Sequence, residues 1–558
     1  MTNGAANNAA QHITALFLLQ INNAFLVRVP LHEGSITEGV VGTTPPRINP
    51  VTDDPFASAG AENDLTMLIY SGLMRATPEG TFIPDLAESY TVSEDAKVYT
   101  FKLKKGLVWQ DGKPITSADV AFTIEKVQDP KIDSPHLASW DGVTVKTPDD
   151  QTVVFTLSAP YSPFIQNTTL GILPKHLWSA IHPESFETYS LNADPIGSGP
   201  YKVRAKKINE NDTAEYYVLE AFDKYALGEP FIKTIRIQFY ADENVMTDAY
   251  RSGYLTSMYS ISPETAQKLE RDGYTVKRAG LPRIFGAFFN QNKASVFTKK
   301  EVREALDMSI DRKEIIDKVL FGYASAIYGP LPPGSLGYSE HAVDPTTSNE
   351  QMIQNGKALL EQAGWKQDEH GVFTKKAAKD TLRLSFTIST TKEAPELLAI
   401  ADILKHRWEK MGAEVTVKVF NTKTELENTA IRPRDYEVLL FGEIIGRDSD
   451  PYAFWHSSQR MDPGLNIASY TNLAVDTALQ KARTTTDIPT RIEQYKLFQD
   501  AIENDTPAVF LYSPQLIYLT RDTVQGMDLK NLNTPSERFL DVYTWFVKTE
   551  RVWKIFQH

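Results

Sequence analysis

Alternating apolar and polar positions predict a β-rich segment early in the chain. Over residues 99–103, Tyr, Phe and Leu alternate with polar residues, which is the period of a strand with one buried face. Residues 143–145 and 153–157 show a similar pattern, and the Pro-Asp-Asp sequence at 148–150 between them is typical of a hairpin turn. A helix is expected before this β-rich segment, over about residues 62–74.

The clearest α/β pattern lies in the second half of the chain. Apolar residues recur at helical spacing over 397–411, and Gly412 follows where a helix C-terminal glycine belongs. Strand patterns over 382–388, 415–419 and 436–441 surround this helix. Strands that alternate with helices predict a parallel sheet. Because ligands of such sheets bind beyond the carboxyl ends of the strands, the loop after residue 441 is a candidate binding region.

Two apolar stretches bracket this second half. Residues 285–290 enter it and residues 509–512 leave it. If both stretches cross between two lobes, the protein has a two-strand hinge, and closure around a few linking residues is an established way to enclose a ligand.

Length and composition exclude several classes of protein. The 558 residues are too many for one ordinary domain, so at least two cores are expected. The formal charge of 58 − 71 = −13 argues against a nucleic-acid-binding protein. Cys is absent, which excludes disulfides, Cys-type zinc sites and thiol nucleophiles. The apolar stretch over 13–27 is too short and too interrupted to span a membrane, and it is either a helix or a remnant beside an export or anchor segment.

A search for catalytic motifs predicts a binding protein without a cofactor, a metal or an active site. The chain has no phosphate-binding loop and no Gly-x-Ser-x-Gly nucleophile elbow. Its ten His residues are scattered, and the nearest pair, His176 and His182, is not spaced to share a helix face. An acid and a base that come together from distant positions stay open as an alternative.

The range 442–451 carries the densest charged cluster at a predicted strand end. We expect Glu443 and Asp448 to contact a ligand there, with Gly442 and Arg447 beside them and Trp455 following. A carboxylate next to aromatic rings can hold an amino group and cover an apolar side chain. The alternative is a solvated loop, and for Asp450 we favour a helix cap over ligand contact.

Eight segments together give the chain a resemblance to the extracytoplasmic solute-binding proteins of ABC importers, in family 5, which binds dipeptides, oligopeptides and nickel. The segments are PDLAESY (84–90), YTFKL (99–103), WQDGKPITSADV (109–120), GSGPY (197–201), YALGEP (225–230), FN (289–290), VREAL (302–306) and ALLEQAGW (358–365). Each segment alone is weak, but their order and spacing over some 500 residues make the resemblance specific.

The resemblance implies an α/β two-lobe fold of the type II periplasmic-binding-protein (Venus-flytrap) class with an extra β-rich subdomain. It predicts an N-terminal extension (1–34), lobe I (35–61, 194–284 and 515–558), the extra subdomain of lobe I (62–193) and lobe II (285–514). The ligand would lie between the lobes.

The resemblance also implies a set of ligand contacts. In relatives the amino group of a peptide is held by an Asp in the loop just before an Asp-Pro or Glu-Pro pair, which here is residues 450–451. Counting back from this pair places the anchor position on Gly446, with Asp448 two residues later. In lobe I, the main chain of the segment before the first long helix would hydrogen-bond to the main chain of the peptide. Because such bonds do not involve the peptide's side chains, peptides of different sequence would bind. The predicted ligand-binding residues are Ser58, Ala59, Gly60, Phe288, Asn290, Gly442, Glu443, Arg447, Asp448 and Trp455.

The function that the resemblance implies is that of a non-enzymatic, monomeric, extracytoplasmic receptor that captures short peptides and delivers them to a membrane permease. Receptors for an oligosaccharide, a nickel chelate or haem share this fold and stay open: Trp455 could stack on a sugar ring, while only His456 lies near the loop as a metal ligand. A surface hydrolase or a chaperone-like protein is the alternative from another class.

Overall fold

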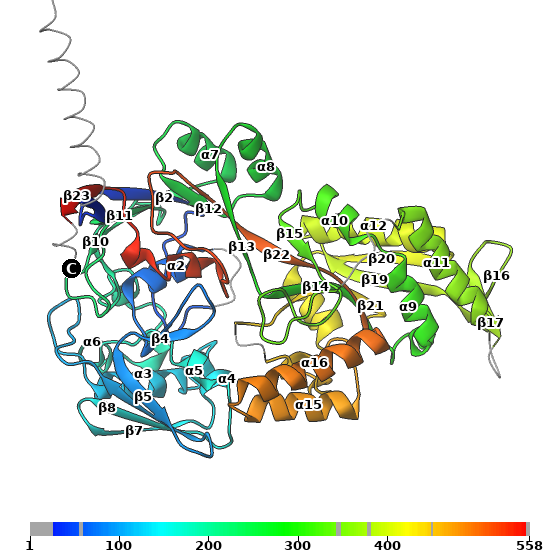
Figure 1. Cartoon of the computed structure of the whole chain (residues 1–558), viewed down its shortest axis with the longest axis horizontal. Helices are drawn as coiled ribbons and strands as arrows, with labels where there is room; N and C mark the ends of the chain where they lie inside the picture. The colour runs from blue at the N-terminus through cyan, green and yellow to red at the C-terminus, as the bar shows by residue number, and fades with distance from the viewer. Residues whose placement is uncertain (1–25, 55–59, 342–346, 377–380, 448–449, 554–558) are drawn as a thin grey trace, which may run out of the picture.

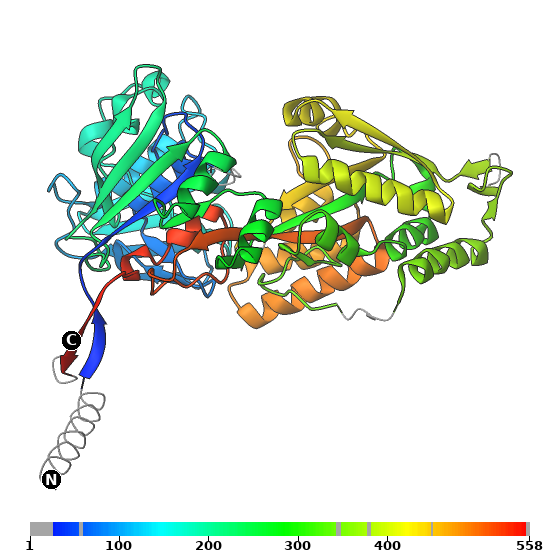
Figure 2. The same ribbon diagram turned by 90° about the horizontal axis from the view of Figure 1, so that it is seen from above.

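The protein consists of two α/β lobes joined by a sheet that continues from one into the other (Figure 1). The computed structural model describes residues 26–54, 60–341, 347–376, 381–447 and 450–553. Lobe I holds the first half of the chain and the C-terminal segment, and lobe II holds most of the second half (Figure 2). The expected two-lobe class is therefore confirmed.

One long mixed sheet forms the spine of the molecule. Its strands, in spatial order, are β20 (Glu414–Phe420), β19 (Ser385–Thr391), β21 (Val438–Ile444), β14 (Arg283–Phe289), β22 (Ala508–Thr520), β12 (Ser257–Tyr259), β2 (Ser35–Val41), β11 (Thr234–Tyr240), β10 (Ala214–Ala221) and β9 (Tyr201–Ile208). In addition, β13 (Val276–Gly280) and β15 (Ala324–Ala326) both pair with β22.

Strand β22 connects the two lobes. Its first half pairs antiparallel with β14 in lobe II, and its second half pairs antiparallel with β12 and β13 in lobe I. Residues 281–282, between β13 and β14, form a second crossing beside it. The two apolar stretches identified in the sequence thus lie side by side in the sheet, as a hinge requires.

The β-rich subdomain of lobe I packs on its own four-stranded antiparallel sheet. The strand order is β5 (Ala87–Val92), β6 (Val98–Leu103), β8 (Thr152–Thr156) and β7 (Thr144–Asp149). Trp140, Phe155 and Phe164 form a cluster of rings against it, with centroids 5.5 to 5.6 Å apart. Such aromatic packing contributes to the buried core of this subdomain.

Helices complete both lobes. Those of lobe I are α2 (Ala61–Ile69), α3 (Ser117–Val127), α4 (Leu137–Trp140), α5 (Phe164–Asn167), α6 (Lys175–Trp178), α7 (Glu243–Arg251) and α8 (Pro263–Arg271). Those of lobe II are α9 (Lys300–Met308), α10 (Arg312–Lys318), α11 (Asn349–Gln362), α12 (Pro395–Met411), α13 (Lys423–Leu426), α14 (Tyr452–Trp455), α15 (Leu473–Thr484) and α16 (Ile488–Asp505). In the described part of the chain, no helix combines the length and apolar character needed to cross a bilayer.

Lobe II is a three-layer arrangement around its part of the sheet. Helices α9, α11 and α12 cover one face, and their apolar side chains form one core with that face. Helices α13 to α16 cover the other face with a second core. The apolar positions that recur over 397–411 are buried along α12, and Gly412 adopts the left-handed conformation that ends the helix.

The sequence misplaced several local features. Helix α2 ends at Ile69 rather than near residue 74, because the chain turns into the short strand β3 (Met74–Ala76). Strand β21 continues past Phe441 to Ile444, since β14 offers it backbone partners over that whole length. Gly442 and Glu443 therefore lie within the strand and not in the loop after it.

The first and last strands of the described chain pair with each other outside the body of the molecule (Figure 2). Strands β1 (Leu26–Pro30) and β23 (Thr549–Trp553) form a separate two-stranded antiparallel ribbon at the edge of lobe I. The apolar stretch over 13–27 that the sequence analysis considered falls almost entirely outside the described residues.

A buried ionic cluster fixes the C-terminal segment to the centre of lobe I. Arg538, in the turn Pro535–Phe539, donates to Asp64 of α2 at 2.8 Å and to Glu38 of β2 at 3.0 Å, and all three side chains are fully buried. Tyr518 also donates to Glu38 at 2.9 Å. Burial raises the pKa of Glu38 even though Arg538 opposes that shift.

Candidate functional site

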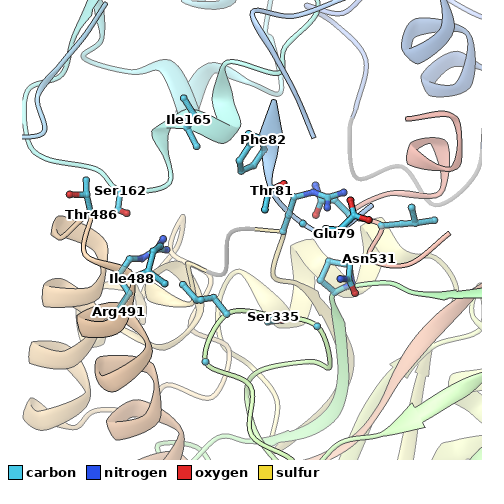
Figure 3. Close-up of a pocket in the computed structure, with 18 of the residues that line it drawn as sticks. Glu79, Thr81, Phe82, Ser162, Ile165, Ser335, Thr486, Ile488, Arg491 and Asn531 are labelled. Atoms are coloured by element: carbon cyan, nitrogen blue, oxygen red, sulfur yellow. The ribbon is translucent and has the colours of Figure 1, made fainter. Parts of the chain in front are cut away.

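A cavity of about 760 Å³ lies between the lobes, beside the hinge (Figure 3). Lobe I and its subdomain contribute Glu79, Gly80, Thr81, Phe82, Tyr90, Val92, Tyr99, Ser162, Ile165, Asn531, Leu532 and Asn533. The end of β13 contributes Gly280, the crossing segment contributes Pro282, and lobe II contributes residues 333–337, Arg447, Thr486, Ile488 and Arg491. This volume lies within the usual range for small-ligand sites.

The lobe I wall is a tight hairpin that projects toward lobe II. Strands β3 and β4 (Phe82–Pro84) pair, and the Thr77 amide donates to the Thr81 carbonyl at 2.9 Å across the turn. Gly80 in this turn has a φ of +87°, which glycine adopts without strain. The turn presents the Thr81 hydroxyl and the Phe82 ring to the cavity.

The lobe II wall combines a glycine-rich loop with the first turn of α16. A Cβ added to Gly337 would lie 2.6 Å from Tyr495 of α16, so the loop can approach the helix only because this residue is glycine. A Cβ added to Gly334 would lie 2.7 Å from the Asn531 side-chain oxygen, which belongs to lobe I. The two lobes therefore touch at Gly334, at the edge of the cavity.

Arg447 joins the two lobes next to the cavity. Its Nη1 donates to the Thr77 carbonyl of lobe I at 3.0 Å, and its Nη2 forms an ion pair with Glu537 of lobe I. The two side chains are only 5% and 11% exposed. Glu537 also accepts from the Asn533 amide at 2.5 Å, so Arg447 is held by backbone and side-chain groups of lobe I together.

A second interlobe contact lies on the other side of the cavity. The Ser162 amide of the subdomain donates to the carbonyl of Arg483, at the end of α15, at 2.9 Å. The Arg483 guanidinium stacks over the rings of Tyr161 and Tyr452, at 5.1 and 4.3 Å, and pairs with Asp450 at 3.0 Å. These bonds connect the subdomain to the end of α15 and to Asp450, just before α14.

The cavity lining is more apolar than polar, and it carries few charged side chains. Glu79 pairs with Lys530 at 3.0 Å, and the hydrogen bond from that ammonium group lowers the pKa of Glu79. Hydroxyl groups come from Thr81, Ser162, Ser335 and Thr486. The Asn533 side-chain oxygen is buried beneath the cavity wall and has no hydrogen-bond partner among the described residues. Such a lining can bind peptide-like main-chain groups through hydrogen bonds.

The sequence of the chain matches a known family of binding proteins. The family model "Bacterial extracellular solute-binding proteins, family 5 Middle" matches residues 81–463. The chain belongs to family 5 of the bacterial extracellular solute-binding proteins.

Individual members of the family match over nearly the whole chain. Protein XP55 of Streptomyces lividans is 30% identical over 487 residues, which cover 86% of this chain and 84% of that protein. The oligopeptide-binding protein AppA of Bacillus subtilis is 27% identical over 504 residues, which cover 89% of both chains. The crystal structure of the ABC transporter substrate-binding protein CtaP of Listeria monocytogenes is 27% identical, with a TM-score of 0.75 over 92% of this chain and 99% of that one.

The predicted contacts of this family 5 protein fall in different places. Ser58, Ala59 and Asp448 lie outside the described residues, and their roles stay predictions. Gly60 directly precedes α2 in lobe I. Arg447 lines the interlobe cavity, but its charge is already paired with Glu537.

Three other predicted contacts lie in the interior of lobe II. Phe288 and Trp455 are fully buried in the same core, with ring centroids 6.3 Å apart, so neither presents a surface to a ligand in this structure. Asn290 is also buried, and it supports the backbone by donating to the Arg434 carbonyl at 3.0 Å. Packing, rather than ligand contact, accounts for these side chains here.

Gly442 and Glu443 lie beside a smaller cavity within lobe II and do not line the interlobe one. Asp450 accepts from the Tyr452 amide at 3.4 Å, at the start of α14, in addition to pairing with Arg483. This contact is a local turn before α14, whose N-cap position is Pro451, so the prediction that Asp450 is the cap residue was wrong.

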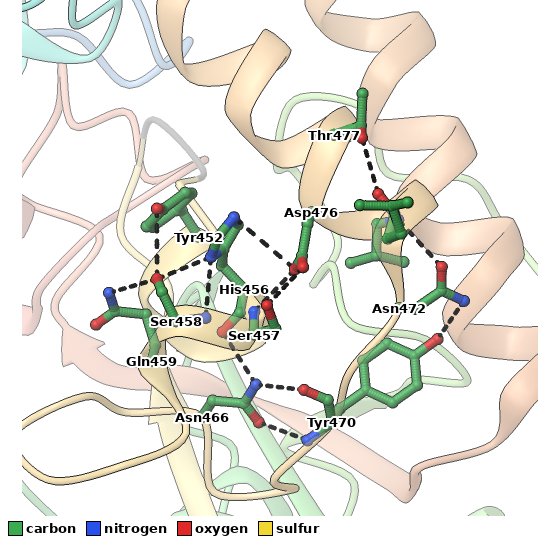
Figure 4. A network of polar contacts seen from close by, with 12 residues as sticks. Tyr452, His456, Ser457, Ser458, Gln459, Asn466, Tyr470, Asn472, Asp476 and Thr477 are labelled. Atoms are coloured by element: carbon green, nitrogen blue, oxygen red, sulfur yellow. Dashed lines mark hydrogen bonds and ion pairs between the residues drawn. The ribbon is translucent and has the colours of Figure 1, made fainter.

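A polar network around α14 brings a Ser, a His and an Asp together, as Figure 4 shows. Asp476 accepts from the Ser457 amide at 2.8 Å and from its hydroxyl at 2.5 Å, while His456 bonds the Ser458 hydroxyl at 2.8 Å. The His456–Asp476 separation of 3.8 Å is too long for the hydrogen bond that orients a catalytic His. These bonds attach the segment after α14 to the N-terminal turn of α15, and none of these four residues lines the interlobe cavity.

Sequence reasoning missed most of the cavity wall. The hairpin turn at 79–82, the loop at 333–337 and the start of α16 carry no motif that marks a binding site. The only signal available was the pair Gly334 and Gly337, because a glycine at a close approach marks a place where backbones must meet.

Proposed function

We propose that this family 5 protein is an extracytoplasmic receptor that captures short peptides between its lobes and delivers them to the permease of an ABC importer. The observation that carries the proposal is the 760 Å³ cavity, which both lobes and the hinge enclose. The relative AppA is named as an oligopeptide-binding protein, and CtaP as an ABC transporter substrate-binding protein. The protein acts as a monomer in this proposal.

Main-chain recognition would give the receptor its tolerance of different peptide sequences. The hydroxyls of Thr81, Ser162 and Thr486 around the cavity would bond peptide amides and carbonyls. The main chain of residues 58–60 would add further bonds, and Asp448 would hold the amino group. Glu443 is not needed for this role, since it faces a different cavity.

Closure couples binding to transport in this proposal. Arg447 and Gly334 make contacts between lobes, so these contacts exist only when the lobes are together. A ligand that contacts both walls binds the closed form better and shifts the population toward it. The permease can then distinguish loaded from empty receptor by shape.

A receptor for metal chelates is less well supported than a peptide receptor. None of the described residues that line the cavity is a His or a Met. Among those same described parts of the chain, no group of three His, Cys, Asp or Glu side chains could hold a metal ion. We therefore favour the peptide.

Titration calorimetry with short-peptide pools tests the proposal. We expect saturable binding of a pool of tri- to pentapeptides and weaker binding of the same pool after N-acetylation, because acetylation removes the ammonium group that Asp448 would hold. Asp448→Ala should weaken binding of the free-amine pool several-fold and leave the acetylated pool unchanged. Equal affinity of the protein for both pools would show that the peptide's amino group is not bound by Asp448. Hydrolysis of the peptides by the pure protein would contradict the proposal that the protein is a receptor.

A further inference from the structure

Lobe II contains a second cavity that shares no lining residue with the interlobe one. It has a volume of about 310 Å³ and lies between strand β21, the segment 427–434 and the loop 462–467. Its residues all belong to lobe II, so it does not depend on lobe closure. A cavity of this size suits a small organic molecule.

The walls of this cavity are largely apolar. Phe441 of β21 and Phe454 of α14 contribute two aromatic rings, and Ile431, Leu465 and Ile467 contribute aliphatic side chains. Aromatic faces attract cations as well as apolar groups, because the ring face carries negative charge density. The walls therefore accept an apolar molecule and tolerate a positive charge on it.

Glu443 is the exceptional residue of this cavity. It follows Leu439 and Phe441 on the same side of β21, where the strand's alternation would place another apolar residue. The residue is only 4% exposed, and neither carboxylate oxygen has a hydrogen-bond partner among the described residues. An unpaired buried carboxyl group is costly, so folding alone does not explain an acid at this position.

Charged and titratable groups around the cavity leave Glu443 unpaired. The groups that line the cavity or face Glu443 are Glu427, Arg432, Arg434, Tyr436 and Asp462. Arg434 donates to the carbonyls of residues 431, 460 and 464, and the Tyr436 hydroxyl donates to the Ile467 carbonyl at 2.5 Å. Burial raises the pKa of Glu443 well above its ordinary value and thus favours the protonated carboxyl group.

We propose that this cavity is a binding site for a small organic amine, whose ammonium group pairs with the Glu443 carboxylate and whose apolar part packs against Phe441 and Phe454. A single carboxyl group in apolar walls does not suit a metal ion, which needs several ligands. The site is distinct from the peptide cavity and does not rest on the proposed function.

The proton balance of binding follows from this pairing. The amine enters as RNH3⁺, and the Glu443 carboxyl group releases its proton to solvent and becomes the carboxylate partner. At a pH below the pKa of the amine and below that of the free Glu443 carboxyl group, binding releases about one proton per amine. A neutral molecule of the same shape releases none.

Calorimetry with benzylamine on the full chain tests the site. We expect benzylamine to bind saturably at one site and benzyl alcohol not to bind. Titrations in two buffers of different ionisation enthalpy should show that about one proton is released for each benzylamine bound. Glu443→Gln, which keeps the shape and removes the charge, should weaken benzylamine binding at least about tenfold. Glu361→Gln, at an exposed position of α11, should leave it unchanged.

Two further measurements decide between this site and the peptide cavity. Thermal unfolding of Glu443→Gln at or above the wild-type temperature shows that the variant is folded, and its binding of the peptide pool should be unchanged. Equal benzylamine affinity of Glu443→Gln and wild type, or no benzylamine binding by wild type, would overturn the proposal. Displacement of benzylamine by saturating peptide would also overturn it, because the amine would then occupy the interlobe cavity.

Discussion

Replacement of Arg447 by Met tests whether lobe closure controls ligand affinity. The change keeps most of the side chain's length and removes the charge that pairs with Glu537 and the donor that bonds the Thr77 carbonyl. Separation of the lobes would expose both groups to water, so we expect the substitution to cost little in an open form. In the closed form the variant leaves Glu537 nearly buried without its cation.

The size of the effect follows from that burial. Truncating one partner of a buried, hydrogen-bonded charge pair costs about 2–5 kcal/mol. Because Glu537 keeps its bond from the Asn533 amide, we take the lower end, about 2 kcal/mol, which corresponds to about a 30-fold shift of the closing equilibrium toward the open form. If the empty receptor is mainly open, peptide affinity should fall by the same factor.

Calorimetry of the peptide pool and small-angle scattering measure the two consequences separately. Arg447→Met should bind about 30-fold more weakly and should need more ligand before the radius of gyration falls. Arg447→Met combined with Glu537→Gln should recover much of the loss, because no unpaired charge is then buried. Wild-type affinity in the single variant would refute the role of this ion pair in closure.

Three further predictions concern stability and the cavity walls. Gly334→Ala and Gly371→Ala should each lower the free energy of unfolding by about 1–2 kcal/mol, since both residues have positive φ. Only Gly334→Ala should also weaken peptide binding, about threefold or more, because its Cβ would meet Asn531. Equal peptide affinities of the two variants in calorimetry would contradict the close approach of Gly334 to Asn531. As pH rises from 5 to 8, the Glu443 carboxyl group loses its proton in the unfolded chain before it does so in the folded one. Its contribution to the free energy of unfolding therefore falls by up to about 1.4 kcal/mol per pH unit, and Glu443→Gln should show a flatter dependence of that free energy on pH. Parallel pH profiles of variant and wild type would mean that Glu443 is not protonated when buried. Arg538→Met should lower the free energy of unfolding by about 3–5 kcal/mol in urea titrations, because its two carboxylate partners stay buried without a cation; a loss below about 1 kcal/mol would show that the cluster is not a structural anchor.

The interior of lobe II could be predicted because local patterns determine it. The apolar spacing over 397–411 gave α12 and its C-terminal glycine, and the strands on either side gave the parallel pairs of β19 with β20 and β21. In each case the buried face repeats with the period of the element that carries it. The resemblance then supplied the two-lobe arrangement, which periodicity alone could not.

The binding region could be predicted only in part, for physical reasons. Gly442 interrupts the apolar run, so the sequence predicted a strand that ends at Phe441, whereas pairing with the distant strand β14 extends it to Ile444. That pairing moved Glu443 from a loop into the wall of a separate cavity. Trp455 follows charged residues in sequence, yet the core formed by α15, α16 and β22 encloses it completely.

The interlobe wall itself depends on contacts between segments far apart in the chain. Arg447 meets Thr77 and Glu537, and Gly334 meets Asn531, at separations that no local pattern encodes. Turns such as 79–82 carry no periodic signal, because their conformation is set by the lobes that hold them. Only the three-dimensional arrangement brings these turns to one cavity.

Native mass spectrometry of the purified protein tests the central claim most directly. The account predicts a population with the added mass of one short peptide, which is lost on gentle denaturation and returns when the refolded protein meets a peptide pool. A refolded chain that binds no member of the pool, or one that returns the peptide cleaved, would contradict a receptor that encloses its ligand and releases it unchanged.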